Sequence, residues 1–287
     1  NSDCAPFVWT GSVSTDYHTA GNWNKGVVPG PVDNAWIPTS PVGGLFPIAS
    51  ADVEVTDLTV RTGASLNMAP TFGLILNGTA TVDGTVTLES SMAGTAWMDD
   101  FTSLSAVWNG DITVQTYVST GSGLGQRYFG SPVVAGSVTG LDATYAGGYP
   151  LGQLIPEPTC DPNQLAVNSP YSNLFQWNED ATFTYSCPQA GWEAISEASI
   201  LTPGRGYSGW MNDGSTISIS GAPNTGDVIY NTTGISAPAV TGSTGWHVLS
   251  NPFPSPLDIS AVTVGGGWTS PQIYNGASGA YSGTFFP

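Results

Sequence analysis

The sequence predicts an all-β protein, with an N-terminal β-solenoid-like or meander region followed by a β-sandwich. Gly and Pro supply 37 and 22 of the 287 residues, so few segments of helical length escape a helix-breaking residue. Charged residues, which include the helix-favouring Lys, Arg and Glu, make up only 9%, whereas 40% of the residues are hydrophobic and can form a core. Short alternating apolar and polar runs recur along most of the chain, as expected for strands.

The first region, residues 1–118, contains a repeated spacing of apolar residues. Leu58, Leu66, Leu74 and Val82 are eight residues apart, and glycines separate the short runs that hold them. A fixed period in short strands favours a stacked β-solenoid or a tight meander. A plain antiparallel sheet with hairpins of similar length is the alternative.

The second region, residues 126–287, is predicted to be a β-sandwich of short strands broken by glycine. Strands are expected near 174–178, 191–195, 215–220 and 272–275. The Ser-, Thr- and Gly-rich residues 119–125 form the predicted linker between the two regions. Two similar pieces, FGSPV at 129–133 and LSNPF at 249–253, suggest an internal repeat.

The charge of the chain excludes nucleic acid as a partner. Only four cations oppose 21 acidic residues, which gives a formal net charge of −17, and phosphate contacts need basic side chains. No run of 18 apolar residues occurs, so no membrane span is expected. The start at Asn1 fits the removal of a secretory signal, although a trimmed chain would begin in the same way.

The three cysteines are Cys4, Cys160 and Cys187. Cys160 and Cys187 flank a polar stretch, and we expect them to form a disulfide, which would imply an oxidising compartment. Buried free thiols are the alternative. Cys4 is the odd cysteine. We expect it to be a free thiol, or to be linked to another chain or to a part of the protein outside this sequence.

Motifs for catalysis or cofactor binding are absent from the sequence. His18 and His247 have no metal-ligand spacing around them, and no HExxH, GxSxG or CxxC pattern occurs, so we expect no enzymatic activity. The GxGxxG match at 204–209 leads into a predicted turn rather than a helix, which argues against a dinucleotide site. Arg205 within it is expected to pair with an acidic neighbour or to stack on Tyr207 or Trp210.

Two pairs of adjacent carboxylates, Asp99-Asp100 and Glu179-Asp180, do not suit a glycosidase. Neighbours in a strand point to opposite faces, whereas that reaction needs two carboxylates across a cleft. They are expected to be turn residues, or ligands of an exposed Ca²⁺ ion as the alternative. No other cofactor is expected.

The ten tryptophans provide candidate glycan contacts, because aromatic faces stack on sugar rings. Trp210 and Trp268 lie in loop-like contexts and are the exposed candidates. The tryptophans in patterned segments are expected in the core: Trp23, Trp36, Trp177, Trp192 and Trp246.

The N-terminal pieces WTG at 9–11, STDY at 14–17, AGNW at 20–23 and DNAWIP at 33–38 carry a resemblance to a known class. They resemble the opening of many secreted, surface-displayed proteins of the Bacteroidota, and pieces near 126–132, 201–207, 226–228 and 245–252 look like the same class in the same order. Members of this class typically leave the cell by the type IX secretion route, using a C-terminal sorting domain, and many serve as adhesins or matrix components. No such domain occurs here, and the chain ends within a predicted strand, so we expect it to be the N-terminal portion of a longer protein.

The resemblance and the missing catalytic motifs together suggest a non-catalytic extracellular surface adhesin or structural fibre component. Its expected partners are cell-surface or matrix glycans, or further copies of itself in a fibre. The alternative is a carbohydrate-binding or accessory region of a longer secreted hydrolase. A catalytic domain beyond Pro287 would favour the hydrolase, and repeated β modules with a sorting domain would favour the adhesin.

Overall fold

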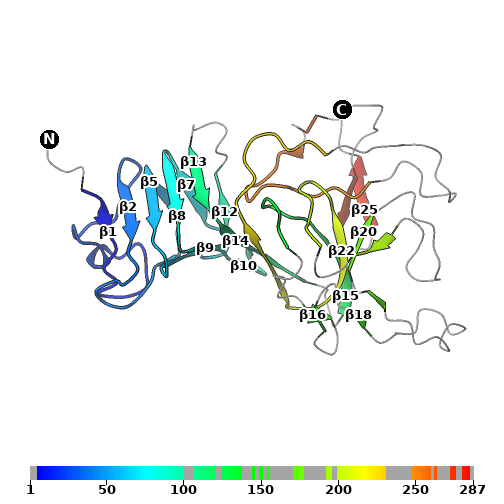
Figure 1. Ribbon diagram of the computed structural model, residues 1–287, viewed down its shortest axis with the longest axis horizontal. Coiled ribbons are helices and arrows are strands. Elements are labelled where there is room, and N and C mark those ends of the chain that lie inside the picture. Colours follow the sequence, from blue (N-terminus) through cyan, green and yellow to red (C-terminus); the bar gives the residue numbers. More distant parts are fainter. Residues whose placement is uncertain are drawn as a thin grey trace, which may run out of the picture.

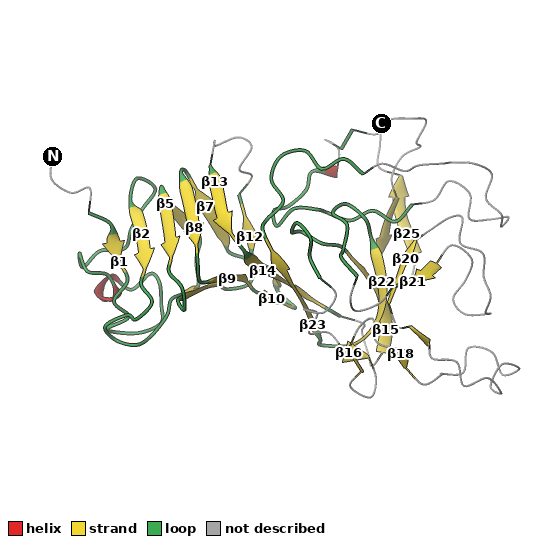
Figure 2. Cartoon of the chain, viewed as in Figure 1, coloured by secondary structure: helices red, strands yellow, loops and turns green. Residues whose placement is uncertain are grey.

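The structure, a computed structural model, confirms the all-β prediction. It describes residues 5–99, 106–119, 124–137, 199–230 and 247–259, and shorter pieces at 144–145, 149–150, 154–155, 171–172, 174–177, 192–195, 262–263, 272–275 and 280–284. Strands dominate these residues, as Figure 2 shows, and the one named helical element is the 3-10 turn η1 (Ala20–Asn22). The coils of the first region follow one another along the long axis, with the second region beyond them (Figure 1).

The first region is a solenoid of parallel strands arranged in three sheets. Sheet 1 contains β1 (Phe7–Val8), β2 (Asn34–Ile37), β5 (Asp57–Val60), β8 (Thr79–Val82) and β13 (Val107–Gly110). Sheet 2 contains β3 (Ile48–Ala49), β6 (Ser65–Met68), β9 (Thr85–Leu88), β14 (Ile112–Tyr117) and, from the second region, β23 (Thr216–Gly221). Sheet 3 contains β4 (Val53–Val55), β7 (Gly73–Leu76) and β12 (Trp97–Met98).

The eight-residue spacing is the distance from one sheet to the next around a coil. Leu58, Leu66 and Leu74 lie in β5, β6 and β7, one in each sheet, and Val82 lies in β8 back in sheet 1. All four side chains are buried inside the solenoid. The N–H of Thr79 donates to Asp57 Oδ1, 22 residues earlier, so three strands and their corners complete one coil. The solenoid prediction is therefore confirmed, and the antiparallel alternative is wrong because these strands pair in parallel.

The stacked strands align residues of one kind inside the solenoid and of another kind outside. One inward row in sheet 2 consists of apolar residues: Ala49, Met68, Leu88, Val114 and Ile219. The neighbouring outward row contains Asn67, Thr87, Thr113 and Ser220. Because side chains alternate between the two faces of a strand, the apolar row forms the core and the polar row meets solvent.

An aromatic cluster covers the N-terminal end of the solenoid. The rings of Trp9, Tyr17 and Trp23 pack with centroids 4.9 to 6.4 Å apart, and all three are buried. The segment 22–24 runs antiparallel along the outer edge of β1, where Thr10 N–H donates to the carbonyl of Asn22 (2.7 Å). This segment removes an open edge, which otherwise invites pairing with another chain.

Asn22 holds this cap together. Its side chain is fully buried and accepts hydrogen bonds from the N–H groups of Val13 (2.9 Å) and Ser14 (3.0 Å). Its amide nitrogen donates to Ser14 Oγ (3.1 Å) and to the carbonyl of Asp16 (2.8 Å). One amide therefore satisfies four polar groups of a loop that has no regular strand to pair with.

The second region covers the opposite end of the solenoid. Strand β23 pairs antiparallel with β14 over six residues, with Ile219 opposite Val114. On the outer face the hydroxyls of Thr113 and Ser220 lie 2.8 Å apart. In sheet 3, the N–H of Met98 donates to the carbonyl of Pro254 (3.0 Å). Two of the three sheets thus continue into residues of the second region.

The core of the second region lies on a four-stranded antiparallel sheet. Its strands, in spatial order, are β15 (Leu124–Phe129), β22 (Tyr207–Asn212), β20 (Leu174–Trp177) and β21 (Trp192–Ala194). Phe129, Leu174, Tyr207 and Met211 of this sheet belong to one hydrophobic cluster with the buried side chains of the solenoid. A second facing sheet is not defined among the described residues, so the sandwich stays a prediction, as does the domain boundary.

The remaining described strands form two-stranded antiparallel sheets. These are β10 (Ser90–Ser91) with β11 (Gly94–Thr95), β16 (Thr144–Tyr145) with β17 (Tyr149–Pro150), β18 (Leu154–Ile155) with β19 (Tyr171–Ser172), and β24 (Gln272–Asn275) with β25 (Ala280–Thr284).

The two similar pieces, 129–133 and 249–253, meet at Asn224. The side-chain amide of this buried residue donates to the carbonyl of Pro252 (2.6 Å), and its backbone N–H donates to the carbonyl of Pro132 (3.4 Å). Ser250 Oγ donates to the carbonyl of Arg205 (2.9 Å) and occupies the space where Gly130 would carry a Cβ. The two pieces therefore contact the same residues inside the second region.

Candidate functional site

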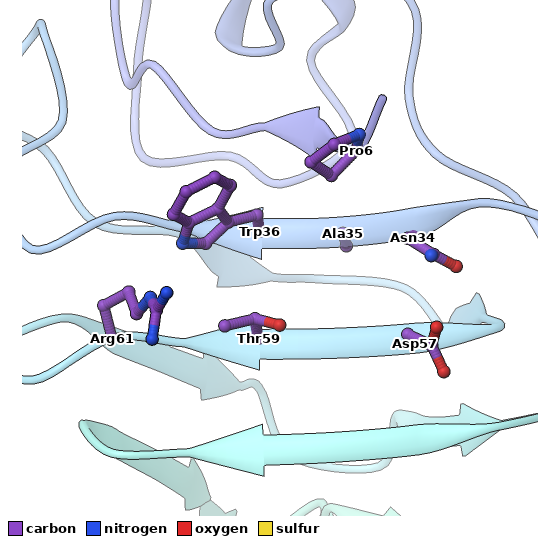
Figure 3. Close-up of a pocket in the computed structure, with 7 residues that line it drawn as sticks. All are labelled: Pro6, Asn34, Ala35, Trp36, Asp57, Thr59 and Arg61. Carbon is purple, nitrogen blue, oxygen red and sulfur yellow. The ribbon is translucent and has the colours of Figure 1, made fainter. Parts of the chain in front are cut away.

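A shallow groove of about 250 Å³ lies on the outer face of sheet 1, near the N-terminal end of the solenoid. Figure 3 shows the side chains along it, which come from β2, β5, the residue before β1 and the residue after β5. The lining residues are Pro6, Asn34, Ala35, Trp36, Asp57, Thr59 and Arg61.

The strand register explains why these side chains gather. Asn34 pairs with Asp57, and Trp36 pairs with Thr59, in the parallel ladder between β2 and β5. The alternate residues Ala35 and Leu58 are buried inside the solenoid. Because strand side chains alternate, the polar and aromatic residues are presented outward in two adjacent rows.

Trp36 and Arg61 form one end of the groove. The guanidinium carbon of Arg61 lies 5.3 Å from the centre of the Trp36 ring, within the range of a cation–π contact. The same guanidinium lies 3.6 Å from Asp83 Oδ2, with both side chains about half exposed. The Trp36 indole nitrogen is covered and has no hydrogen-bond partner among the described residues. This end therefore combines an aromatic face with a cation and an unpaired donor.

Asp57 and Asn34 form the other end. Asp57 Oδ1 accepts the N–H of Thr79 (2.7 Å), which fixes the carboxylate on the strand. A carboxylate has acceptor capacity for further partners, and the exposed Asn34 amide offers both donors and an acceptor. The half-buried Thr59 hydroxyl lies between the two ends on β5. The groove thus offers donors and acceptors beside an aromatic surface, which suits a polyhydroxylated ligand.

The structure does not test the glycan contacts that the sequence suggested. Trp210 lies within β22 rather than in a loop, so the loop-like context expected for it is wrong. Trp268 lies outside the described residues, as do Cys4, Cys160 and Cys187, so the disulfide stays a prediction.

The two acidic pairs considered for Ca²⁺ lie wholly or partly outside the described residues. Asp100, Glu179 and Asp180 lie outside the described residues, and Asp99 follows β12. Within the described part of the chain no group of three or more His, Cys, Asp or Glu residues could hold a metal ion.

The two histidines lie in different regions. His18 is part of the N-terminal cap, where Nε2 lies 3.2 Å from the carbonyl oxygen of Asp52. The His247 ring packs edge-on against Tyr230 in the second region, with centroids 6.3 Å apart.

The GxGxxG segment leads into a strand, and Arg205 has partners that the sequence did not suggest. Gly204 has φ +80°, and the segment runs directly into β22. Arg205 donates to Gln176 Oε1 (2.8 Å) and lies 5.7 Å from the centre of the Tyr230 ring. Tyr230, the aromatic residue that Arg205 contacts, is 25 residues away in the sequence, so local sequence patterns do not predict this contact.

Sequence reasoning placed Trp36 in the core and so missed the groove. The available signal was the alternation in Asn34-Ala35-Trp36-Ile37, where Ala35 and Ile37 are buried and Trp36 is only partly covered. Trp36 alternates with two small or aliphatic residues and shares its side of the strand with the polar Asn34. This alternation indicates that Trp36 lies on the outer face of the solenoid.

No protein-family model matches the chain, and neither a curated protein nor a solved structure matches it. Among the described residues no helix is long and apolar enough to cross a membrane.

Proposed function

We propose that this chain is a non-catalytic, extracellular adhesin that presents a glycan-binding face on its solenoid. The groove on sheet 1 carries this proposal, because an aromatic ring, a cation, a carboxylate and an amide line one open surface. Side chains of this kind recognise ligands that combine hydroxyl groups with apolar ring faces.

The ends of the solenoid favour an adhesin over a fibre built by stacking solenoids. The segment 22–24 covers the edge of β1, and β23 covers the edge of β14, each by antiparallel pairing. Parallel coils of another copy would need those edges to continue the ladder. Self-association through the solenoid ends is therefore disfavoured at these two edges.

The same groove also serves the second candidate, a carbohydrate-binding or accessory region of a longer secreted hydrolase. The groove supports glycan binding in either setting. The full reading frame of the gene distinguishes them, because a catalytic domain beyond Pro287 would favour the hydrolase.

A glycan array tests the proposal, combined with light scattering and broad glycosidase assays on the purified chain. We expect binding to a subset of glycans, a particle mass that stays constant with concentration, and no turnover. Turnover lost on mutation of a single carboxylate would overturn the adhesin, and growth into filaments would favour the fibre. Absence of binding to every glycan would remove the proposed ligand class.

A further inference from the structure

We propose that the groove on sheet 1 binds a neutral oligosaccharide lying along β5, with Trp36 as its aromatic platform. This inference rests on the proposed function, and it names the site and the ligand class. It centres on Trp36, which is not one of the glycan contacts that the sequence suggested.

The length of the groove favours a short chain of sugars over a single ring. Asp57, Thr59 and Arg61 are alternate residues on the same side of one extended segment. At about 3.3 Å per residue, four residue steps cover about 13 Å. A ligand that reaches both Asp57 and Arg61 must therefore extend beyond one pyranose ring.

Each polar side chain along the groove can form a hydrogen bond with a hydroxyl group of the ligand. Asp57 accepts from a ligand hydroxyl, and Thr59 both donates and accepts. Arg61 donates, and its long side chain is held between Trp36 and Asp83. Pro6 adds apolar surface on the opposite side of β2 from Thr59. Both apolar and hydrogen-bonding contacts are thus available to one ligand.

The unpaired indole nitrogen of Trp36 provides a further donor. A covered polar group without a partner costs free energy, and a ligand oxygen would remove that cost. In Figure 3 this nitrogen is on the side of Arg61. The nitrogen is covered in the structure, so a ligand oxygen reaches it only if a neighbouring side chain, such as the half-exposed Arg61, moves aside.

Charge argues for a neutral ligand. The chain carries a formal net charge of −17, so an anionic polysaccharide is repelled during approach. Within the groove, the carboxylate of Asp57 would face a uronic acid or sulfate group without a compensating cation beside it. The one cation of the groove, Arg61, is already 3.6 Å from Asp83.

The test uses isothermal titration calorimetry of the whole chain with cellotetraose, mannotetraose and xylotetraose, and with tetragalacturonate as the acidic comparison. Trp36→Ala is expected to weaken binding of a neutral ligand about tenfold or more, because a central aromatic anchor dominates such contacts. Trp36→Phe keeps an aromatic face and should lose less. Asp57→Asn keeps the Oδ1 acceptor for Thr79 and is expected to weaken binding severalfold without unfolding the strand.

Thr113→Ala, on the outer face of sheet 2, is the matched control and should leave binding unchanged. Circular dichroism and the melting temperature verify that each variant folds. A neutral glycan that binds wild type, Trp36→Ala and Asp57→Asn equally overturns this site while leaving the adhesin proposal intact. Preference for tetragalacturonate overturns the ligand class. Absence of binding to these probes and to a broad glycan array contradicts both proposals.

Discussion

The carbonyl oxygen of Pro254 accepts a hydrogen bond of 3.0 Å from the backbone N–H of Met98. Met98 is a fully buried residue of β12, the last strand of sheet 3, and Pro254 follows the second of the two similar pieces. The solenoid therefore ends against a segment that is remote in sequence. The stability of its last coil depends on the residues that hold this segment in place.

Asn224→Ala tests that dependence. The substitution removes the donor to Pro252 and leaves this carbonyl without its 2.6 Å partner in a buried setting. We expect a loss of about 1 to 3 kcal/mol in the free energy of unfolding, measured by urea denaturation. Asn77→Ala, at an exposed position with 3.2 Å hydrogen bonds, should change stability by less than about 0.5 kcal/mol. Equal effects of the two substitutions would contradict this role.

Gly73→Ala is expected to destabilise sheet 3. A Cβ at Gly73 would lie 2.4 Å from the ring of Trp97 on the neighbouring strand, so the indole has to move. Overpacking of this kind costs about 1 to 3 kcal/mol. Gly30→Ala is the control, because its nearest neighbour, Asp33 Oδ2, would be 3.8 Å away. A Gly73→Ala protein with the melting temperature of the wild type would refute the contact.

Asn22→Ala should weaken the N-terminal cap strongly, because four hydrogen bonds end on this one amide. We expect a loss of at least about 2 kcal/mol, since several polar groups would stay buried without partners. Asn22→Asp keeps the acceptor oxygen for Val13 and Ser14 but places a carboxylate oxygen against the carbonyl of Asp16 in a fully buried position, so it should destabilise the cap at least as much. Differential scanning calorimetry measures both, and a melting temperature of the wild type in Asn22→Ala would contradict the role of this amide.

Asp16 makes the cap sensitive to acid. A hydrogen bond from Thr19 Oγ1 (2.8 Å) lowers the pKa of the Asp16 carboxylate below its usual value of 3.8. A folded-state pKa below the unfolded one adds stability above the unfolded pKa, and this stability is lost as the pH falls through the folded pKa. The stability difference between wild type and Thr19→Val should therefore be present at pH 6 and shrink below about pH 4. A difference independent of pH would contradict the linkage.

Much of the solenoid could be predicted from the sequence, because its core follows a local period. Leu58, Leu66, Leu74 and Val82 gave the correct spacing between strands. The same spacing fits a meander, since the pattern of buried residues within each strand is identical in both. The choice depends on pairing between residues about 22 apart, such as Asp57 and Thr79, which no local signal encodes.

The candidate site and the end of the solenoid were less accessible to prediction. Thr113 and Ser220 are 107 residues apart, yet their strands lie side by side. The groove depends on the register between β2 and β5, which brings Trp36 beside Thr59. Residue type alone suggested that Trp36 was buried, because large aromatic residues usually are.

The late position of β23 in the chain has a consequence for biosynthesis. A ribosome completes β14 long before residues 216–221 exist, so the nascent solenoid passes through a stage in which the edge of β14 has no partner from β23. An unpaired strand edge is a template for association between molecules, and chains fold from their N-terminus as they are made. The strand that finishes the fold therefore also ends this vulnerable interval, and any product terminated before residue 216 would retain the open edge permanently.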